Sequence, residues 1–290
     1  MTLEAYPKIT LRQKINAIVR IFRPELPFAA GVCVLVGQVL ALGAFPPLQL
    51  AVLGFLCGFF LSGTALILND YFDLEVDRVN APERPLPSGS ITKKEVIALG
   101  AITTLLGLAA AVGLGIPAFV LSAITWVVGL LYNWRFKQAG LIGNLMVSYS
   151  VAVTFILGGM AAGDPWNPLV WTFSLMAFGI NLGEEIAGDA MDIEGDRQRG
   201  SRSIAILKGR SYALRISAAV FALVVVVTLV PAWLGWLGAS YLAMILITDS
   251  MIVLFTTRLL KSRTPEEGRR AMRGIYLGAL VGLLAFLVGI

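Results

Sequence analysis

The sequence predicts an all-α membrane protein that crosses the bilayer nine times. The chain of 290 residues is 57% hydrophobic and only 14% charged, whereas an ordinary soluble domain is about 45–50% apolar and about 25% charged. Several apolar runs reach the roughly 20 residues that a helix needs to cross a bilayer. These runs are continuous rather than alternating, which excludes a closed β-barrel.

Two kinds of connection separate the expected spans. We expect the spans at roughly 25–45, 48–68, 95–114, 117–134, 142–162, 168–188, 212–233, 238–258 and 271–290. Four connections are short and contain no Lys or Arg, namely those near Phe45–Leu48, Leu114–Pro117, Gly163–Asn167 and Leu234–Ala239. The others are longer and polar, namely 69–94, 135–141, 189–211 and 259–270.

The distribution of basic residues predicts on which side of the membrane each connection lies. All 23 lie in the polar loops, the N-terminal segment or the immediate helix ends. Because Lys and Arg accumulate in cytoplasmic loops, we expect a cell-membrane protein with its N-terminus and all four polar loops in the cytoplasm and its C-terminus outside. Residues 1–23 are expected to lie at the membrane interface, where Ile15, Ile18, Val19 and Phe22 would form the apolar stripe of an amphipathic helix.

Composition limits the kind of site that the chain can build. It has no His, and its two cysteines, Cys33 and Cys57, fall inside apolar segments, so a zinc site and a disulfide framework are not expected. A metal would be held by oxygen ligands, which suit Mg²⁺ or Ca²⁺. The net charge of +5 follows from the distribution of charge across the membrane, and no nucleic-acid partner is expected.

Two acidic motifs with the spacing DxxDxxxD follow the second and sixth spans. They consist of Asp70, Asp73 and Asp77, preceded by Asn69, and of Asp189, Asp192 and Asp196. Such positions share one face of a helix. Carboxylates facing one cavity repel one another, and Mg²⁺ binds one or two carboxylates together with substrate phosphates. We expect these residues to hold Mg²⁺ and a diphosphate and the aspartates to be catalytic; the alternative is that they are ordinary acidic helix ends.

A basic loop follows each acidic motif. Candidates to meet a phosphate are Arg78, Arg84 and Lys93 after the first motif, Arg197 after the second, and Arg23 before the first span. Cationic side chains stabilise a departing diphosphate, although each of these residues could instead belong to the general positive charge of the cytoplasmic face. The matched motifs also hint at a repeat of spans 1–4 and 5–8 within one domain, 1–290.

The motifs resemble those of a known family. The stretch NDYFDLEVDRVNAPERPLPSG resembles the first signature, NDxxDxxxD, of the UbiA superfamily of intramembrane prenyltransferases, and GDAMDIEGDRQRGSRSIAILKG resembles its second, DxxDxxxD. The resemblance covers essentially the whole chain. Within the superfamily, the first motif, RPLPSG-x-I and D-x-EGD are most similar to digeranylgeranylglyceryl phosphate synthases, archaeal enzymes of ether-lipid synthesis. Chlorophyll-synthase-type members share the RP-x-PSG tail.

The resemblance implies nine helices around a central cavity, capped on the cytoplasmic side by the polar loops. It also implies that Mg²⁺ bridges the two motifs and the diphosphate of a polyprenyl donor, and that a lipophilic acceptor attacks the allylic carbon. We expect geranylgeranyl transfer to geranylgeranylglyceryl phosphate. The alternatives are an aromatic acceptor such as 4-hydroxybenzoate or another quinone precursor, a chlorophyll-type acceptor, or, in another class, a divalent-cation transporter.

Three further residues carry over from the family pattern, which has a YxxxK-type motif after the fourth span. Tyr132 matches it, but the basic residues come at Arg135 and Lys137 rather than at the matching position. We expect Tyr132, Lys137 and Asn144, which lies in a Gly-Asn pair, to contact substrate. Glu185 extends the acidic face of the second motif by one helical turn, and Asp249, midway along a span, is left outside the metal site.

Overall fold

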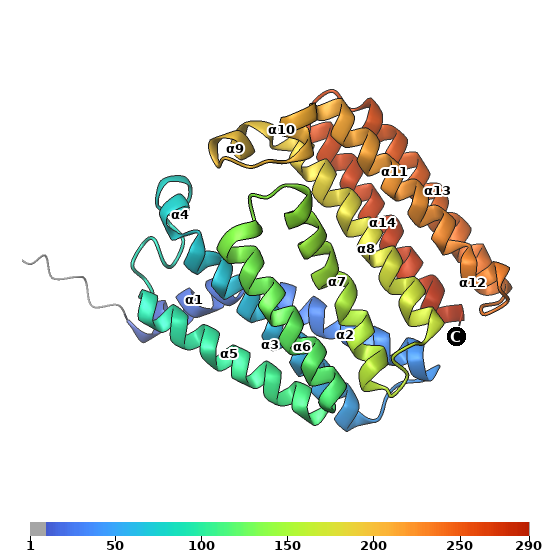
Figure 1. Cartoon of the computed structure of the whole chain (residues 1–290), viewed down its shortest axis with the longest axis horizontal. Helices are drawn as coiled ribbons and strands as arrows, with labels where there is room; N and C mark the ends of the chain where they lie inside the picture. The colour runs from blue at the N-terminus through green and yellow to red at the C-terminus, as the bar shows by residue number, and fades with distance from the viewer. Residues whose placement is uncertain (1–9, 290) are drawn as a thin grey trace, which may run out of the picture.

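The chain is all-helical over residues 10–289, which are the residues that the computed structural model describes (Figure 1). The long helices are α2 (Glu25–Leu42), α3 (Leu48–Phe72), α5 (Lys93–Gly113), α6 (Ile116–Leu131), α7 (Leu141–Ala161), α8 (Pro168–Met191), α11 (Arg210–Thr228), α13 (Ala239–Lys261) and α14 (Pro265–Gly289). The short helices are α1 (Leu11–Phe22), α4 (Leu74–Asn80), α9 (Ile193–Gln198), α10 (Ile204–Lys208), α12 (Val230–Trp233) and the π-helix η1 (Tyr132–Phe136).

Each expected span corresponds to one long helix. Within the described residues, eight helices are long and apolar enough to cross a membrane, and the exception is α8. It has 24 residues, but Asn181, Glu184 and Glu185 make it more polar than its neighbours. The span expected at 212–233 corresponds to the apolar stretch Arg210–Trp233. Within it α11 ends at Thr228 and the short α12 begins at Val230, beside Pro231, which lacks the N–H of a helical hydrogen bond.

Small residues allow α2 and α7 to approach very closely. A Cβ atom added at Gly158 of α7 would lie 2.2 Å from the carbonyl oxygen of Val34, and one added at Gly37 of α2 would lie 2.1 Å from that of Phe155. Close contact of backbones through small residues is the usual way in which membrane helices pack. Gly37 and Gly158 therefore serve helix packing here.

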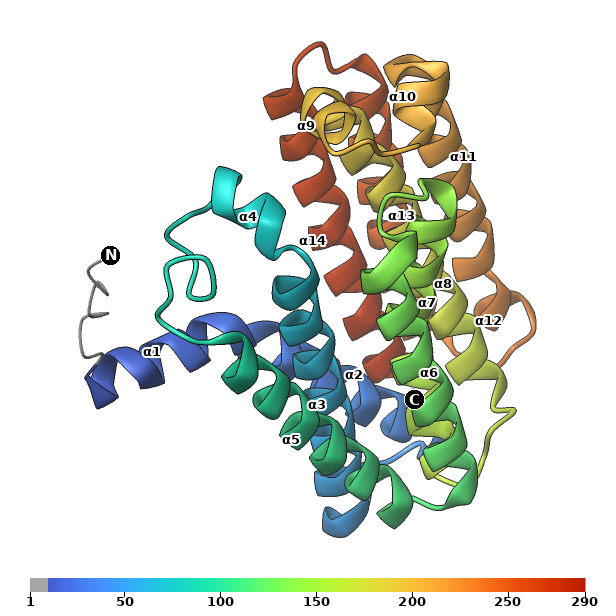
Figure 2. The ribbon, with the colours of Figure 1, turned by 60° about the vertical axis from the view of Figure 1, so that its left-hand side comes forward.

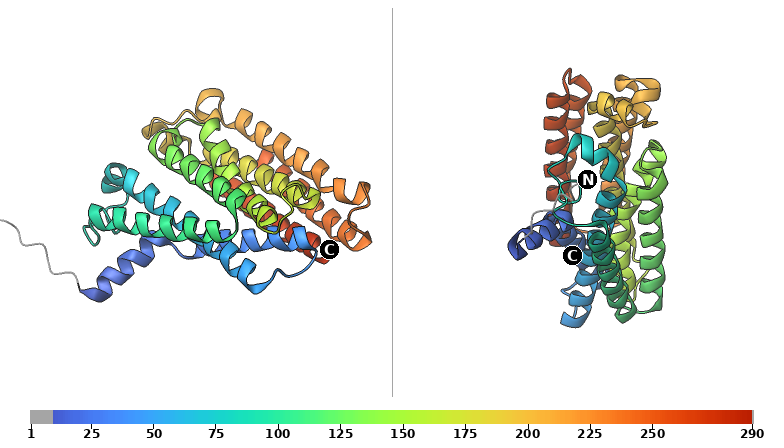
Figure 3. Two further views of the ribbon diagram at one scale, coloured as in Figure 1. Left: turned by 60° about the horizontal axis from the view of Figure 1, so that its bottom comes forward. Right: turned by 90° about the vertical axis from the view of Figure 1, so that its left-hand side faces the viewer.

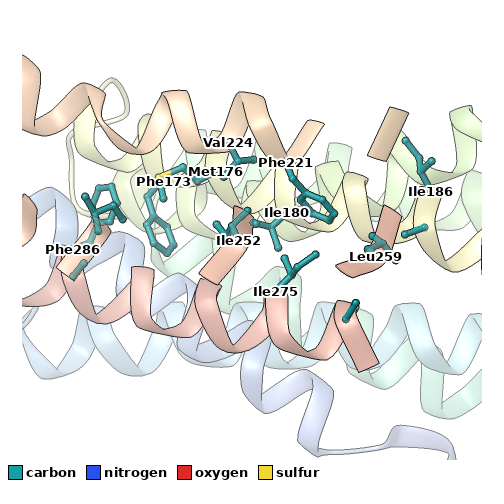
Figure 4. Packing of buried hydrophobic residues seen from close by; sticks show 14 of the residues in the cluster. Phe173, Met176, Ile180, Ile186, Phe221, Val224, Ile252, Leu259, Ile275 and Phe286 are labelled. Carbon is teal, nitrogen blue, oxygen red and sulfur yellow. The ribbon is translucent and has the colours of Figure 1, made fainter. Parts of the chain in front are cut away.

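The largest apolar core lies among α8, α11, α13 and α14 (Figure 4). A series of edge-to-face aromatic pairs runs through it, with ring centroids of Phe155 and Phe173 4.8 Å apart and those of Phe173 and Phe286 5.0 Å apart. Such pairs add about 0.5–1.5 kcal/mol each to the burial of the rings. This core holds α8, which carries the second acidic motif, in a fixed position.

A smaller core supports the first acidic motif. Side chains from α1, the end of α3, α4, the following loop and the start of α5 meet in it, including Ile21, Ile67, Leu74 and Ile91. Helix α1 runs crosswise to the long helices α8 and α14 (Figure 2), and a hydrogen-bonded capping box at Thr10 starts it. The first nine residues of the expected interfacial segment lie outside the described residues.

Both motif-bearing helices end on the same side of the bundle. The short helices α4, α9 and α10 gather at that end, and the chain's C-terminal end lies at the other (Figures 1 and 3). Helix α3 packs against α2 and α5, and α8 packs against α7 and α11. The two motifs thus occupy comparable places, while the internal repeat stays a prediction.

Candidate functional site

The first acidic motif spans the end of a membrane helix. Asp70 lies in the last turn of α3, Asp73 follows its last residue, and Asp77 lies in α4. We expected all three carboxylates on one continuous helical face, and this is wrong in detail. The helix ends at Asp73, whose φ and ψ are −82° and 0°, so Asp77 is carried by a separate helix of only seven residues.

The second motif is built in the same way. Asp189 lies in the last turn of α8, Asp192 follows its last residue with φ and ψ of −127° and 32°, and Asp196 lies in α9. Here too the continuous helical face is replaced by a break at the middle aspartate. A break of this kind lets the third carboxylate turn back over the helix end instead of continuing away from it.

Basic side chains neutralise the buried carboxylates of the first motif. Arg23 bonds Asp70 at 2.5 Å, and Arg84 lies 2.7 Å from Asp77 and 3.9 Å from Asp70. Asp70 is 3% and Asp77 is 6% exposed, and buried carboxylates need such partners. Burial acts to lower the pKa of Arg84, but its hydrogen bond to Asp77 and the nearby acidic charges outweigh this and raise its pKa above the ordinary value.

Arg23 holds an unusual backbone conformation at the junction of α1 and α2. Its φ of 47° makes it the one non-glycine residue with positive φ in the described part of the chain. A side chain in this region costs of order 1–3 kcal/mol and is often found at functional sites. The strained junction directs the Arg23 guanidinium to Asp70.

A π-helical turn after Tyr132 brings Lys137, rather than Arg135, to the first acidic motif. The η1 turn makes the backbone N–H of Lys137 donate to the carbonyl of Tyr132 at 2.9 Å, a pairing five residues apart. The π-helix therefore absorbs the one extra residue by which this loop departs from YxxxK, and π-turns are frequent at functional sites. Lys137 forms an ion pair with Asp73 and donates to Asn69 Oδ1 at 2.8 Å, whereas Arg135 is exposed.

The second motif has its own partners. Arg199 lies 2.7 Å from Asp192 and 3.5 Å from Asp196, and Asn144 of α7 donates to Asp189 at 2.9 Å. Burial raises the pKa of Asp196 above its usual value, the Arg199 guanidinium opposes this shift and Asp192 adds to it. Asp196 Oδ2 is buried and has no hydrogen-bond partner within residues 10–289.

Three predicted phosphate-binding residues lie away from the carboxylates of both motifs. Arg78 pairs with Glu75 at 2.8 Å and Arg197 with Glu194 at 3.3 Å, each on its own short helix. Lys93 is exposed at the first turn of α5. Arg199, which stands two positions after Arg197 in the same basic loop, was not among the residues predicted to bind phosphate. No signal in the sequence separates the two.

No metal-binding group of three or more Asp, Glu, Cys or His side chains is preassembled within residues 10–289. The available donors are carboxylate and amide oxygens, which suit a hard cation such as Mg²⁺. Mg²⁺ binds through one or two carboxylates and completes its shell with water and substrate phosphates. Asp196 Oδ2, which has no hydrogen-bond partner within residues 10–289, is free to bind such a metal ion, whose remaining ligands would come from water and the substrate phosphates.

An apolar cavity of about 350 Å³ opens beneath the first motif. It lies between α2, α3, α6 and α7, and on α3 its lining runs from Gly58 to Leu68, the residue before Asn69. Trp126 of α6 forms part of its wall. The site thus joins a charged end, suited to a polyanion, to an apolar interior, suited to a hydrocarbon chain.

Known proteins resemble this chain over most of its length. The sequence model of the UbiA prenyltransferase family matches residues 30–287. A relative named digeranylgeranylglyceryl phosphate synthase, from Thermococcus kodakarensis, is 32% identical over 275 residues, which cover 95% of this chain and 98% of the relative.

Solved structures share the fold. One is a structure reported for digeranylgeranylglyceryl phosphate synthase in membranes. It superposes with a TM-score of 0.84 and 29% sequence identity, and the match covers 96% of this chain and 98% of that protein. A UbiA homologue from Archaeoglobus fulgidus, solved with GPP and Mg²⁺ bound, has a TM-score of 0.67 and 18% identity over 93% of this chain and 99% of its own. At that identity the likeness concerns the fold.

Proposed function

The chain belongs to the UbiA prenyltransferase family, and from this premise we propose that it transfers a geranylgeranyl group to geranylgeranylglyceryl phosphate. The donor is geranylgeranyl diphosphate, the products are the doubly alkylated glyceryl phosphate and diphosphate, and Mg²⁺ is required. The reaction belongs to the synthesis of ether lipids. The relatives that share most of their length with this chain carry the name of that activity.

One observation carries the proposal. Two acidic motifs end two membrane helices on the same side of the bundle, each with cationic side chains at ion-pair distance, and an apolar cavity lies beneath the first of them. An allylic diphosphate has the complementary shape, with a polyanionic head and a hydrocarbon tail. Neither a solvated acidic helix end nor a transport site near the bilayer midplane needs this combination.

The residues of both motifs fit a metal–diphosphate complex. We assign Asn69 and the six aspartates as candidate ligands, namely Asp70, Asp73, Asp77, Asp189, Asp192 and Asp196. Mg²⁺ supplies the charge that neutralises a departing diphosphate. Arg23, Arg84, Lys137 and Arg199 already lie against the carboxylates and can donate to the diphosphate oxygens.

The same residues account for ionisation of the donor. As the allylic C–O bond breaks, negative charge grows on the diphosphate, and cations fixed in advance stabilise that change. Asn144, bonded to Asp189, keeps this carboxylate in place. The hydrocarbon tail lies in the apolar cavity, which keeps water from the carbocation.

The acceptor is proposed to enter beside the second motif. A glyceryl phosphate head carries negative charge, and the loop after α8 is rich in Arg, with Arg197, Arg199 and Arg202 close in sequence. An aromatic carboxylate would need fewer cations.

Because Lys and Arg gather in the loops at this end, we place the N-terminus and the active-site loops in the cytoplasm and the C-terminus outside.

An acceptor assay tests this proposal. Purified protein in nanodiscs is given labelled geranylgeranyl diphosphate with geranylgeranylglyceryl phosphate, 4-hydroxybenzoate or no acceptor, in Mg²⁺ or in EDTA. We expect the ether product with the glyceryl phosphate alone, and no product in EDTA. Transfer to 4-hydroxybenzoate instead would overturn the acceptor assignment. Movement of Mg²⁺ into liposomes without release of diphosphate would support a transporter.

A further inference from the structure

Helix α8 carries a polar stripe that extends inward from the second motif. Asn181, Glu185 and Asp189 follow one another at four-residue spacing, so they share one face of the helix. Two of them are held by α7, since Ser148 donates to Asn181 Oδ1 at 3.1 Å and Asn144 donates to Asp189 Oδ2 at 2.9 Å. Glu185 stands between these two bonded positions.

Glu185 has no hydrogen bond and no ion pair anywhere in the described part of the chain, although its side chain is only partly exposed. An ionisable group at membrane depth without a partner is expensive and by default points to a function. Because Asn181 and Asp189 on the same face of α8 both bond to α7, Glu185 lies on the face of α8 that packs against α7, one turn inward from the second motif.

Glu185 lies one helical turn inward from the second motif. One helical turn, about 5.4 Å, separates it from Asp189, on the side away from the charged loops. One turn further in, Asn181 lines a second apolar cavity of about 190 Å³ between α7, α8, α11, α13 and α14. Glu185 thus lies between the proposed diphosphate level and the apolar interior, where the allylic carbon and the acceptor must meet.

We propose that Glu185 is the general base of the transfer step, a role that rests on the proposed function. As the acceptor oxygen forms its bond to C1 of the geranylgeranyl group, its O–H proton passes to the Glu185 carboxylate. The C1–O bond to diphosphate breaks and its electron pair leaves with diphosphate, so charge and atoms balance. The carboxylates of both motifs have cationic or amide partners. Within residues 10–289, Glu185 and its neighbour Glu184 have none, and of these two only Glu185 shares the helix face of Asn181 and Asp189.

Glu185→Gln separates this step from ionisation. A general base raises the rate of a step by about 100- to 10,000-fold. We therefore expect the rate of ether formation to fall by about 100-fold or more. Because ionisation does not need Glu185, the variant should still release diphosphate and form geranylgeraniol, the product of trapping by water. Glu185→Asp should recover part of the ether formation. The measurement is product partition from labelled donor, with Mg²⁺-dependent binding of a non-ionisable donor analogue as a check on the site.

Glu184→Gln is the matched control. Glu184 is adjacent to Glu185 but turns toward Ile180, Phe221 and Met272, so ether formation should remain at the wild-type rate. Wild-type ether formation by Glu185→Gln would overturn the inference, and so would a parallel loss of ether and diphosphate release in a variant that still binds the analogue. Failure of the wild-type protein to transfer any prenyl group would overturn the proposed function itself, and the inference with it.

Discussion

Replacement of Asp73 or Asp192 with alanine is expected to abolish most turnover. Each residue stands where a membrane helix breaks and a short helix begins, and each is bonded to a cation, Lys137 or Arg199. Loss of one preorganised group that stabilises developing charge lowers turnover by about 100- to 1,000-fold. The measurement is the initial rate of diphosphate release in saturating Mg²⁺.

Glu194→Ala provides the control for the aspartate variants. Glu194 is exposed on α9 and pairs with Arg197 at 3.3 Å, so removing its charge should leave the rate of diphosphate release unchanged. Wild-type rates in Asp73→Ala or in Asp192→Ala would show that the corresponding motif does not take part in the chemistry.

Gly158→Ala is expected to cause a large loss of stability. The added Cβ would lie 2.2 Å from the carbonyl oxygen of Val34, and a backbone atom cannot move aside as a flexible side chain can. Helices α2 and α7 would have to separate, at a cost of roughly 3 kcal/mol in the free energy of unfolding. Thermal unfolding of the detergent-solubilised protein, followed by circular dichroism, should show a lower midpoint.

Gly129→Ala controls for the change of residue type. It also lies in a membrane helix, but a Cβ added there has nothing within 4 Å, so the unfolding midpoint should stay at or slightly above that of the wild type. Equal midpoints for Gly158→Ala and the wild type would contradict the close packing of α2 against α7.

The helices and the acidic motifs were predictable because their signals are local. Continuous apolar runs set the membrane helices, and spacing alone identified both aspartate motifs. The break at the middle aspartate was not predictable, because Asp73 and Asp192 carry no Gly or Pro signal, and only contacts at the helix end stop the helix there. The division into α11 and α12 could have been foreseen from Pro231.

The partners of the aspartates were harder to predict, since they depend on contacts between distant segments. Lys137 reaches Asp73 because a π-helical turn shifts its direction by one residue, which no spacing rule for α-helices contains. Arg84 reaches Asp77 while Arg78 turns to Glu75. On short helices, an acid three residues away competes for each Arg, so sequence proximity to a motif did not identify its ion-pair partner.

Both motifs are proposed to hold one metal–diphosphate complex between them. The most direct test of this proposal is the Mg²⁺-dependent binding of a non-ionisable geranylgeranyl diphosphate analogue to the wild type, to Asp73→Ala, to Asp192→Ala and to the double variant. Residues that act on one ligand as a unit give non-additive losses, so the double variant should bind about as weakly as either single variant. Losses that add independently, or analogue binding in EDTA as tight as in Mg²⁺, would contradict the shared site.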